Sequence, residues 1–104
     1  MSILVFECEI KDKEKLKAVL EQDPYAPLSF SRNGYKLKDG AAVGQDPAKC
    51  YLFFKSTEEF AAFAREKLKG IATESSPAVA EAVARIIQDE ENSAEIGFGS
   101  IFGE

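Results

Sequence analysis

The pattern of apolar residues predicts two long strands. In residues 3–10 every second side chain is apolar: Leu4, Phe6, Cys8 and Ile10. This period of two is typical of a strand with one buried face. Residues 49–56, KCYLFFKS, are apolar on both faces. Such a strand is typical of the centre of a sheet that is covered on both sides, or of one with a partner on its second face.

Apolar residues at helical spacing predict three helices, over residues 12–22, 56–70 and 75–92. Ser56 and Glu59 have the spacing of a capping box, and Gly70 would end the second helix. Pro77 suits the first turn of the third helix.

Two further segments predict strands. Residues 28–38, LSFSRNGYKLK, alternate on both sides of Asn33-Gly34, which predicts a β-hairpin with a type I′ turn. Residues 94–102 alternate glycine with large apolar side chains and predict a last strand. Glycine weakens a strand, so Gly97 and Gly99 would need another backbone or side chain to approach closely.

The resulting order is β-α-β-β-(β)-β-α-α-β, in a single α+β domain over residues 1–104. We expect a mostly antiparallel sheet with the helices packed on one face. The order resembles a ferredoxin-like βαββαβ frame with an inserted hairpin and a doubled second helix. The resemblance is one of element order, and fold alone does not determine function.

The second face of this sheet is the main candidate interface. Six residues are expected to lie there: Val5, Tyr51, Phe53, Gly97, Gly99 and Ile101. An exposed apolar patch of this kind is typical of association. We therefore expect a homo-oligomer, formed through sheet faces or edges, or a protein partner. The alternative is that a third helix or a loop covers this face.

The composition limits the possible chemistry. The chain has no histidine, which excludes Ser-His and Cys-His nucleophile pairs within one chain. With two separate cysteines, Cys8 and Cys50, a structural zinc site is not expected either. We interpret both as buried reduced thiols. A disulfide is possible if their strands are neighbours, but a cytoplasmic location argues against it. Glu7 and Glu9 share one strand face and are a candidate acid–base pair.

The charge is concentrated near the end of the sequence. The net charge is −5, and five acidic residues but no basic ones follow Arg85. Four of them form a candidate calcium site: Asp89, Glu90, Glu91 and Glu95. Carboxylate oxygens are the ligands that Ca²⁺ prefers, although the spacing is not that of an EF-hand loop. A nucleic-acid partner is not favoured, because the composition favours no basic face.

No apolar run approaches the length of a membrane span, and the first residues lack the positive charge of a signal peptide. We expect a cytoplasmic protein without a membrane partner. The first hypothesis is a small acidic binding or interaction module that has no catalytic residues or cofactor and self-associates through its sheet. The alternatives are a calcium-binding protein using residues 89–95 and a small enzyme using carboxylates or a Cys50 thiolate.

Overall fold

The computed structural model describes the backbone of residues 2–102 and the side chains of residues 2–91. Four strands, four α-helices and two short 3₁₀ helices follow one another in these residues. Their bounds are β1 Ser2–Glu9, η1 Ile10–Asp12, α1 Lys13–Leu20, α2 Phe30–Asn33, β2 Lys36–Asp39, η2 Gly40–Val43, β3 Lys49–Ser56, α3 Glu58–Leu68, β4 Thr73–Glu74 and α4 Pro77–Phe102. The chain is thus an α+β protein.

The strands form one antiparallel sheet in the order β2-β3-β1-β4. β1 and β3 pair along their full lengths, from Ser2 opposite Ser56 to Glu9 opposite Lys49. Both long strands predicted from the apolar pattern are therefore confirmed, and they occupy the centre of the sheet. β2 and β4 are the shorter outer strands.

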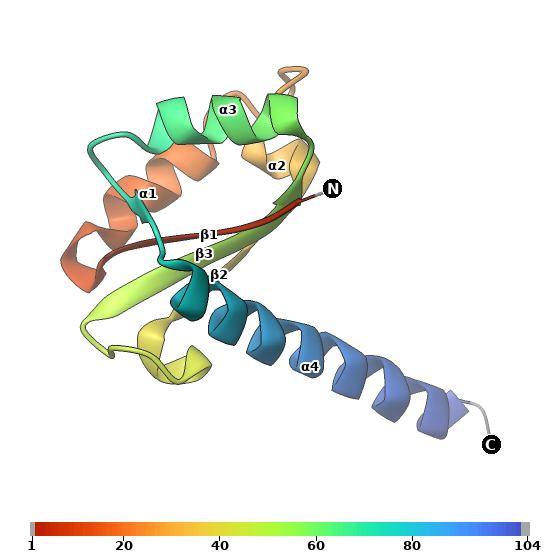
Figure 1. The fold of residues 1–104 in the computed structure, drawn as a ribbon. Coiled ribbons are helices and arrows are strands. Elements are labelled where there is room, and N and C mark those ends of the chain that lie inside the picture. The colour runs from red at the N-terminus through yellow and green to blue at the C-terminus, as the bar shows by residue number, and fades with distance from the viewer. Residues whose placement is uncertain (1, 103–104) are drawn as a thin grey trace.

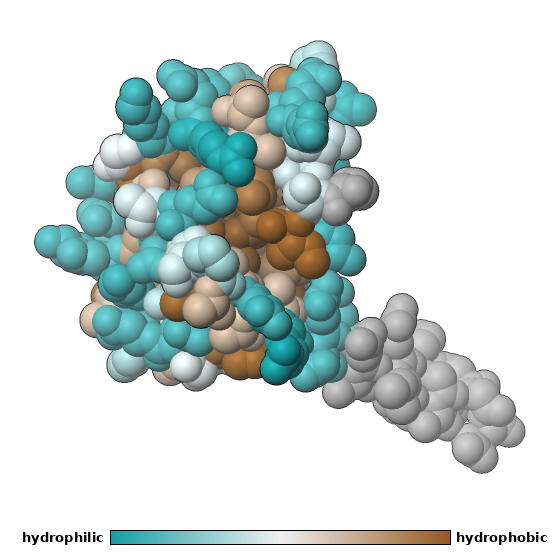
Figure 2. Space-filling model, in the orientation of Figure 1, coloured by the Kyte–Doolittle hydropathy of each residue, from teal (hydrophilic) through white to brown (hydrophobic). Residues whose placement is uncertain are grey.

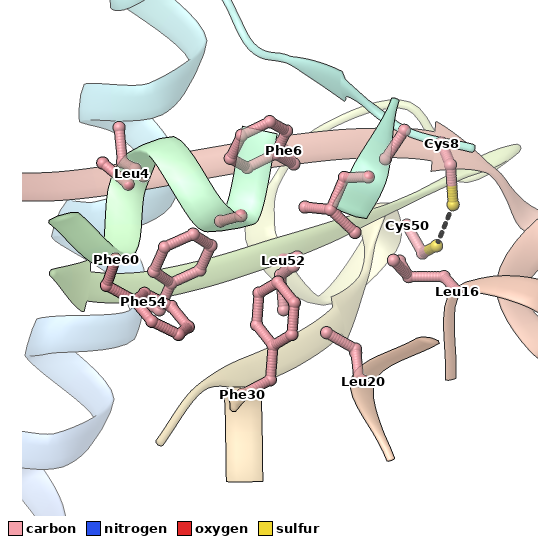
Figure 3. Packing of buried hydrophobic residues seen from close by; sticks show 14 residues of the cluster. Leu4, Phe6, Cys8, Leu16, Leu20, Phe30, Cys50, Leu52, Phe54 and Phe60 are labelled. Atoms are coloured by element: carbon pink, nitrogen blue, oxygen red, sulfur yellow. Dashed lines mark hydrogen bonds between the residues drawn. The ribbon is translucent and has the colours of Figure 1, made fainter. Parts of the chain in front are cut away.

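The first face of the sheet packs against α1, α2 and α3 (Figure 1). Phe54 of β3 lies in this core beside Phe60 (Figure 3). Its ring is stacked on Phe6 and meets Phe30 and Phe60 edge-on, with ring centroids 5.6–5.9 Å apart. Such offset and edge-on pairs add to the stabilisation that comes from burial.

The second face packs against α4, so the expectation that all helices lie on one face was wrong (Figure 1). Val83 and Ile87 of α4 lie on the side chains of Val5, Tyr51 and Phe53. These three sheet residues are at most 4% exposed. These three members of the predicted patch are thus covered within the chain, by a helix together with the segment η2, as the alternative interpretation had it.

The predicted hairpin over residues 28–38 was also wrong. Its first half forms the single helical turn α2, whose N-cap Ser29 accepts a hydrogen bond from the N–H of Arg32. Phe30 is buried in the core, and Asn33 donates to the carbonyl of Lys55. The tertiary contacts of these two side chains outweigh the local strand preference. Only the second half of the segment pairs in the sheet, as β2.

The predicted last strand was wrong as well, because residues 94–102 belong to α4. A helix adds residues at low cost once it has begun, and a glycine in it costs only about 1 kcal/mol. Gly97, Gly99 and Ile101 therefore lie on a helix, and their side-chain surroundings fall outside the described residues. The fourth strand of the sheet is instead the short β4, which the alternation pattern did not predict.

Candidate functional site

The first candidate site is the edge of the sheet near the start of β1. The N–H of Ser75 donates to the carbonyl of Val5 at 2.9 Å. Backbone groups two residues apart in a strand point the same way, so the N–H and C=O of Ile3 face the same edge. The register places Pro77 opposite Ile3, where it begins α4 and has no N–H to donate. Among the described residues, this edge therefore stays unpaired at Ile3.

A groove of about 460 Å³ lies beside this edge, between β1 and α4. Its lining residues are Ile3, Ala80, Glu81, Ala84, Arg85, Gln88 and Asp89. Ile3 is 41% exposed, although most large apolar side chains of the described chain are buried. Figure 2 shows apolar atoms gathered between the start of β1 and α4, with polar atoms around them. The groove combines an apolar floor with a rim that carries both charge signs.

Sequence reasoning missed Ile3. The sequence predicted an interface on the second face of the sheet, but the residues named there included Val5, Tyr51 and Phe53, which are buried in the structure. The same period of two that assigned Val5 to the second face also assigns Ile3 to it. Only the path of α4 shows that Ile3 stays exposed while Val5 does not.

The second candidate site lies at the other end of β1. Cys8 and Cys50 are directly opposite one another in the pairing of β1 with β3. Their side chains point toward each other on the first face of the sheet, with the Sγ atoms 3.0 Å apart (Figure 3). Cys50 is fully buried and Cys8 is 7% exposed. The sequence left open whether these strands are neighbours, and the register answers that they are.

Both cysteines are free thiols. Burial raises the pKa of Cys8 to about 12, and the hydrogen-bonding contact with Cys50 acts in the same direction. A nucleophilic cysteine needs a lowered pKa, so the surroundings of Cys8 disfavour thiolate catalysis at neutral pH. Full burial equally separates Cys50, the residue named in the enzyme hypothesis, from a substrate.

Glu7 lies next to Cys8 in sequence but on the opposite face of the sheet. Lys49 and Ser75 donate hydrogen bonds to its two carboxylate oxygens, each at 2.8 Å. Burial raises the pKa of Glu7, but the two hydrogen bonds outweigh it and hold the pKa below its ordinary value. Glu9 pairs instead with Lys11 at 3.2 Å. The two carboxylates thus have separate partners, and the structure does not support an acid–base pair.

Replacing Glu7 by glutamine is expected to lower the melting temperature by a few degrees at pH 7. The carboxylate contributes stability above its unfolded pKa, and this contribution is lost as the pH falls through the lower folded pKa. The difference from wild type should therefore disappear in acid, as thermal unfolding between pH 2 and pH 7 would show. Glu9→Gln, at an exposed position, is the matched control, and identical pH profiles for the two variants would contradict the assignment.

Three of the four predicted calcium ligands lie within the described side chains, and these three are not brought together. Asp89, Glu90 and Glu91 occupy consecutive positions of α4, so their side chains point in different directions around the helix. Glu90 forms an ion pair with Lys38 of β2 at 3.4 Å. Within residues 2–91, no three His, Cys, Asp or Glu side chains are grouped as metal ligands. The side chain of Glu95 lies outside the described residues, so calcium binding stays a prediction.

Within the described residues, no helix has the length and apolar character that a membrane span requires. Comparison of the chain with protein-family models, with curated proteins and with solved structures finds no match.

Proposed function

We propose that this protein is a non-catalytic interaction module that self-associates through the open β1 edge of its sheet. The observation that carries the proposal is the unpaired backbone of Ile3 beside the groove between β1 and α4. An exposed strand edge is a template for pairing with another strand. The apolar floor of the groove would supply the buried contacts that such pairing needs.

A second copy of the chain fits this edge by symmetry. In an antiparallel pair with a two-fold axis at Ile3, each Ile3 would exchange both of its backbone hydrogen bonds with the other. The two Ile3 side chains would then lie side by side over the grooves. Glu81 and Arg85 on the rim offer both charge signs to the partner's rim. Because the paired segment is short, we expect the dimer to be weak and concentration-dependent.

Replacing Ile3 by lysine is expected to abolish the dimer, because it places two like charges opposite each other at the two-fold axis. The side chain is 41% exposed, so the fold should tolerate the change. Sedimentation equilibrium over a wide concentration range should show wild type rising above the monomer mass of 11.4 kDa and the variant staying at it. Tyr25→Ser, which removes an apolar side chain 93% exposed in the loop between α1 and α2, is the matched control.

Three outcomes would refute the proposal. One is a wild-type protein that stays monomeric at millimolar concentration. Another is a dimer that Ile3→Lys leaves intact, which would place the interface elsewhere. The third is a loss of the dimer in Tyr25→Ser of the same size as in Ile3→Lys, which would indicate unspecific association.

We further propose that the sheet is a variant of the ferredoxin-like frame that the element order resembles. The strand order β2-β3-β1-β4, with antiparallel neighbours throughout, supports this proposal. The connections also fit, since α1 and α3 lie between successive strands and pack on the same face. In this interpretation α4 is an addition that covers the opposite face.

A further inference from the structure

The two cysteines meet the geometric requirements of a disulfide bond. The N–H of Ile10 donates to the carbonyl of Ala48, and Cys8 and Cys50 lie two residues further along the same ladder. They are therefore a hydrogen-bonded pair, whose Cα atoms are typically about 5.5 Å apart. Disulfides form at Cα separations of about 4.4–6.8 Å. The strands are thus already at the spacing that a disulfide needs.

The side chains are also close to bonding distance. The two Sγ atoms are 3.0 Å apart, and a disulfide bond is about 2.05 Å long. The two sulfur atoms would have to approach each other by about 1 Å, and rotation of the two side chains can supply this movement. Neither strand has to move, so the bond would not disturb the core around Leu16 (Figure 3).

Of the two cysteines, Cys8 is the one that solvent and small molecules can reach. Cys8 lines a surface pocket of about 340 Å³, and Cys50 does not. The pocket lies beside the β1 edge, between the segment that leads into β4 and the start of β3. Its lining residues are Glu7, Cys8, Glu9, Asp12, Lys49, Gly70, Ile71, Ala72 and Thr73. A small reagent can therefore reach Cys8, whereas Cys50 is not accessible from this pocket.

We propose that Cys8 and Cys50 form a reversible disulfide between β1 and β3 by exchange with a low-molecular-weight disulfide such as oxidised glutathione. The Cys8 thiolate attacks one sulfur of the reagent, forming a mixed disulfide and releasing one thiol. The Cys50 thiolate then attacks the Cys8 sulfur and releases the second thiol. The two protons of the cysteines end on the two released thiols. The protein loses two electrons, and one reagent disulfide is reduced to two thiols.

Among the described residues, the surroundings of the pair do not supply the ligands of a metal site, and they make the thiol exchange slow at neutral pH. A soft metal ion would normally recruit further ligands, but within residues 2–91 no third His, Cys, Asp or Glu joins the two thiols. Asp12 and Glu9 act on Cys8 as negative charges, and both disfavour its thiolate. Lys13 is a positive charge that interacts with Cys50. The exchange is thus expected to be slow at neutral pH and about tenfold faster for each pH unit in alkaline buffer.

The test is oxidation of the intact reduced chain with oxidised glutathione at pH 8.5, followed by removal of the reagent. We expect intact-mass spectrometry to show the loss of two hydrogen atoms and thiol titration to find no free thiol. The bond closes a long loop, so the oxidised protein should melt at least about 5 °C above the reduced one. Dithiothreitol should reverse all three changes. This readout needs no variant and is independent of self-association.

Two single variants test the order of the steps. Cys50→Ser should accumulate a glutathione adduct at Cys8, whereas Cys8→Ser should react at least tenfold more slowly because Cys50 is fully buried. The proposal is overturned if wild type stays reduced, keeps bound glutathione, or forms a disulfide between two chains. An oxidised form that melts below the reduced one would equally overturn it. Because these outcomes concern wild type, they stand even if a serine variant does not fold.

Discussion

Replacing Phe54 by alanine is expected to destabilise the protein by about 3–5 kcal/mol. Phe54 is 1% exposed, and its ring contacts Phe6, Phe30 and Phe60. The substitution removes a large buried side chain and leaves a cavity between the sheet and α2 and α3. Since a domain of this size has a total stability of about 5–15 kcal/mol, the loss is a large fraction of it. Urea unfolding followed by circular dichroism would measure the change.

Two comparisons make this prediction specific. Phe63→Ala, at a partly buried position on the border of the same core, should cost clearly less than Phe54→Ala. Phe54→Leu keeps most of the buried volume, so it should stay folded and measurable even if the alanine variant does not. Equal losses for the two alanine variants would show that Phe54 does not have the central place in the core that its contacts indicate.

Replacing Gly40 by alanine is expected to cost about 3 kcal/mol or more. A Cβ atom at Gly40 would lie 1.8 Å from the carbonyl oxygen of Asp46 and 3.0 Å from that of Lys49. Both are backbone atoms, so relief requires the whole connection between β2 and β3 to shift. This connection includes η2, whose Val43 covers the second face of the sheet. The cost should therefore exceed that of ordinary overpacking, about 1–3 kcal/mol.

Gly34→Ala is the matched control for Gly40→Ala. A Cβ at Gly34 meets no atom within 4 Å, but the residue has a φ of +84°. Only the conformational cost of a positive φ, about 1–3 kcal/mol, applies there. Thermal unfolding of the two variants should separate the effect of space from that of backbone conformation. If Gly40→Ala is no more destabilised than Gly34→Ala, the close approach at Gly40 is not a constraint on the fold.

The two functional proposals occupy opposite ends of β1 and can fail separately. Ile3 and Cys8 are five residues apart on a strand, or roughly 17 Å. Oxidation of the cysteine pair stabilises the pairing of β1 with β3, and it leaves the edge that faces β4 unchanged. If the protein is found to be monomeric, the interaction proposal is refuted, but the disulfide proposal is unaffected. Conversely, a chain that resists oxidation could still dimerise at Ile3.

The candidate sites differ in how far the sequence could predict them. Alternation placed Ile3 and Val5 on one face, but nothing local distinguished the buried residue from the exposed one. The two cysteines were recognised as buried in strands, yet their separation depends on a register that joins residues 42 positions apart. The hydrogen bonds of Glu7 are likewise non-local, because Lys49 and Ser75 come from β3 and from the segment after β4.

Elements whose signals are local could be predicted from the amino-acid pattern alone. Alternation predicted β1, and an apolar pattern on both faces predicted β3. The end of α3 follows from Gly70, which has a φ of +82°, but its N-cap is Thr57 and not Ser56 of the predicted capping box. The apolar character of both faces of β3 also required a cover on each side. Three features depend on the folded chain as a whole. They are the cover that α4 provides on the second face, the helical turn of residues 30–33, and the continuation of α4 through residues 94–102. The physical reason is that short segments with mixed signals adopt the conformation that their long-range packing stabilises, and this packing exists only in the folded chain.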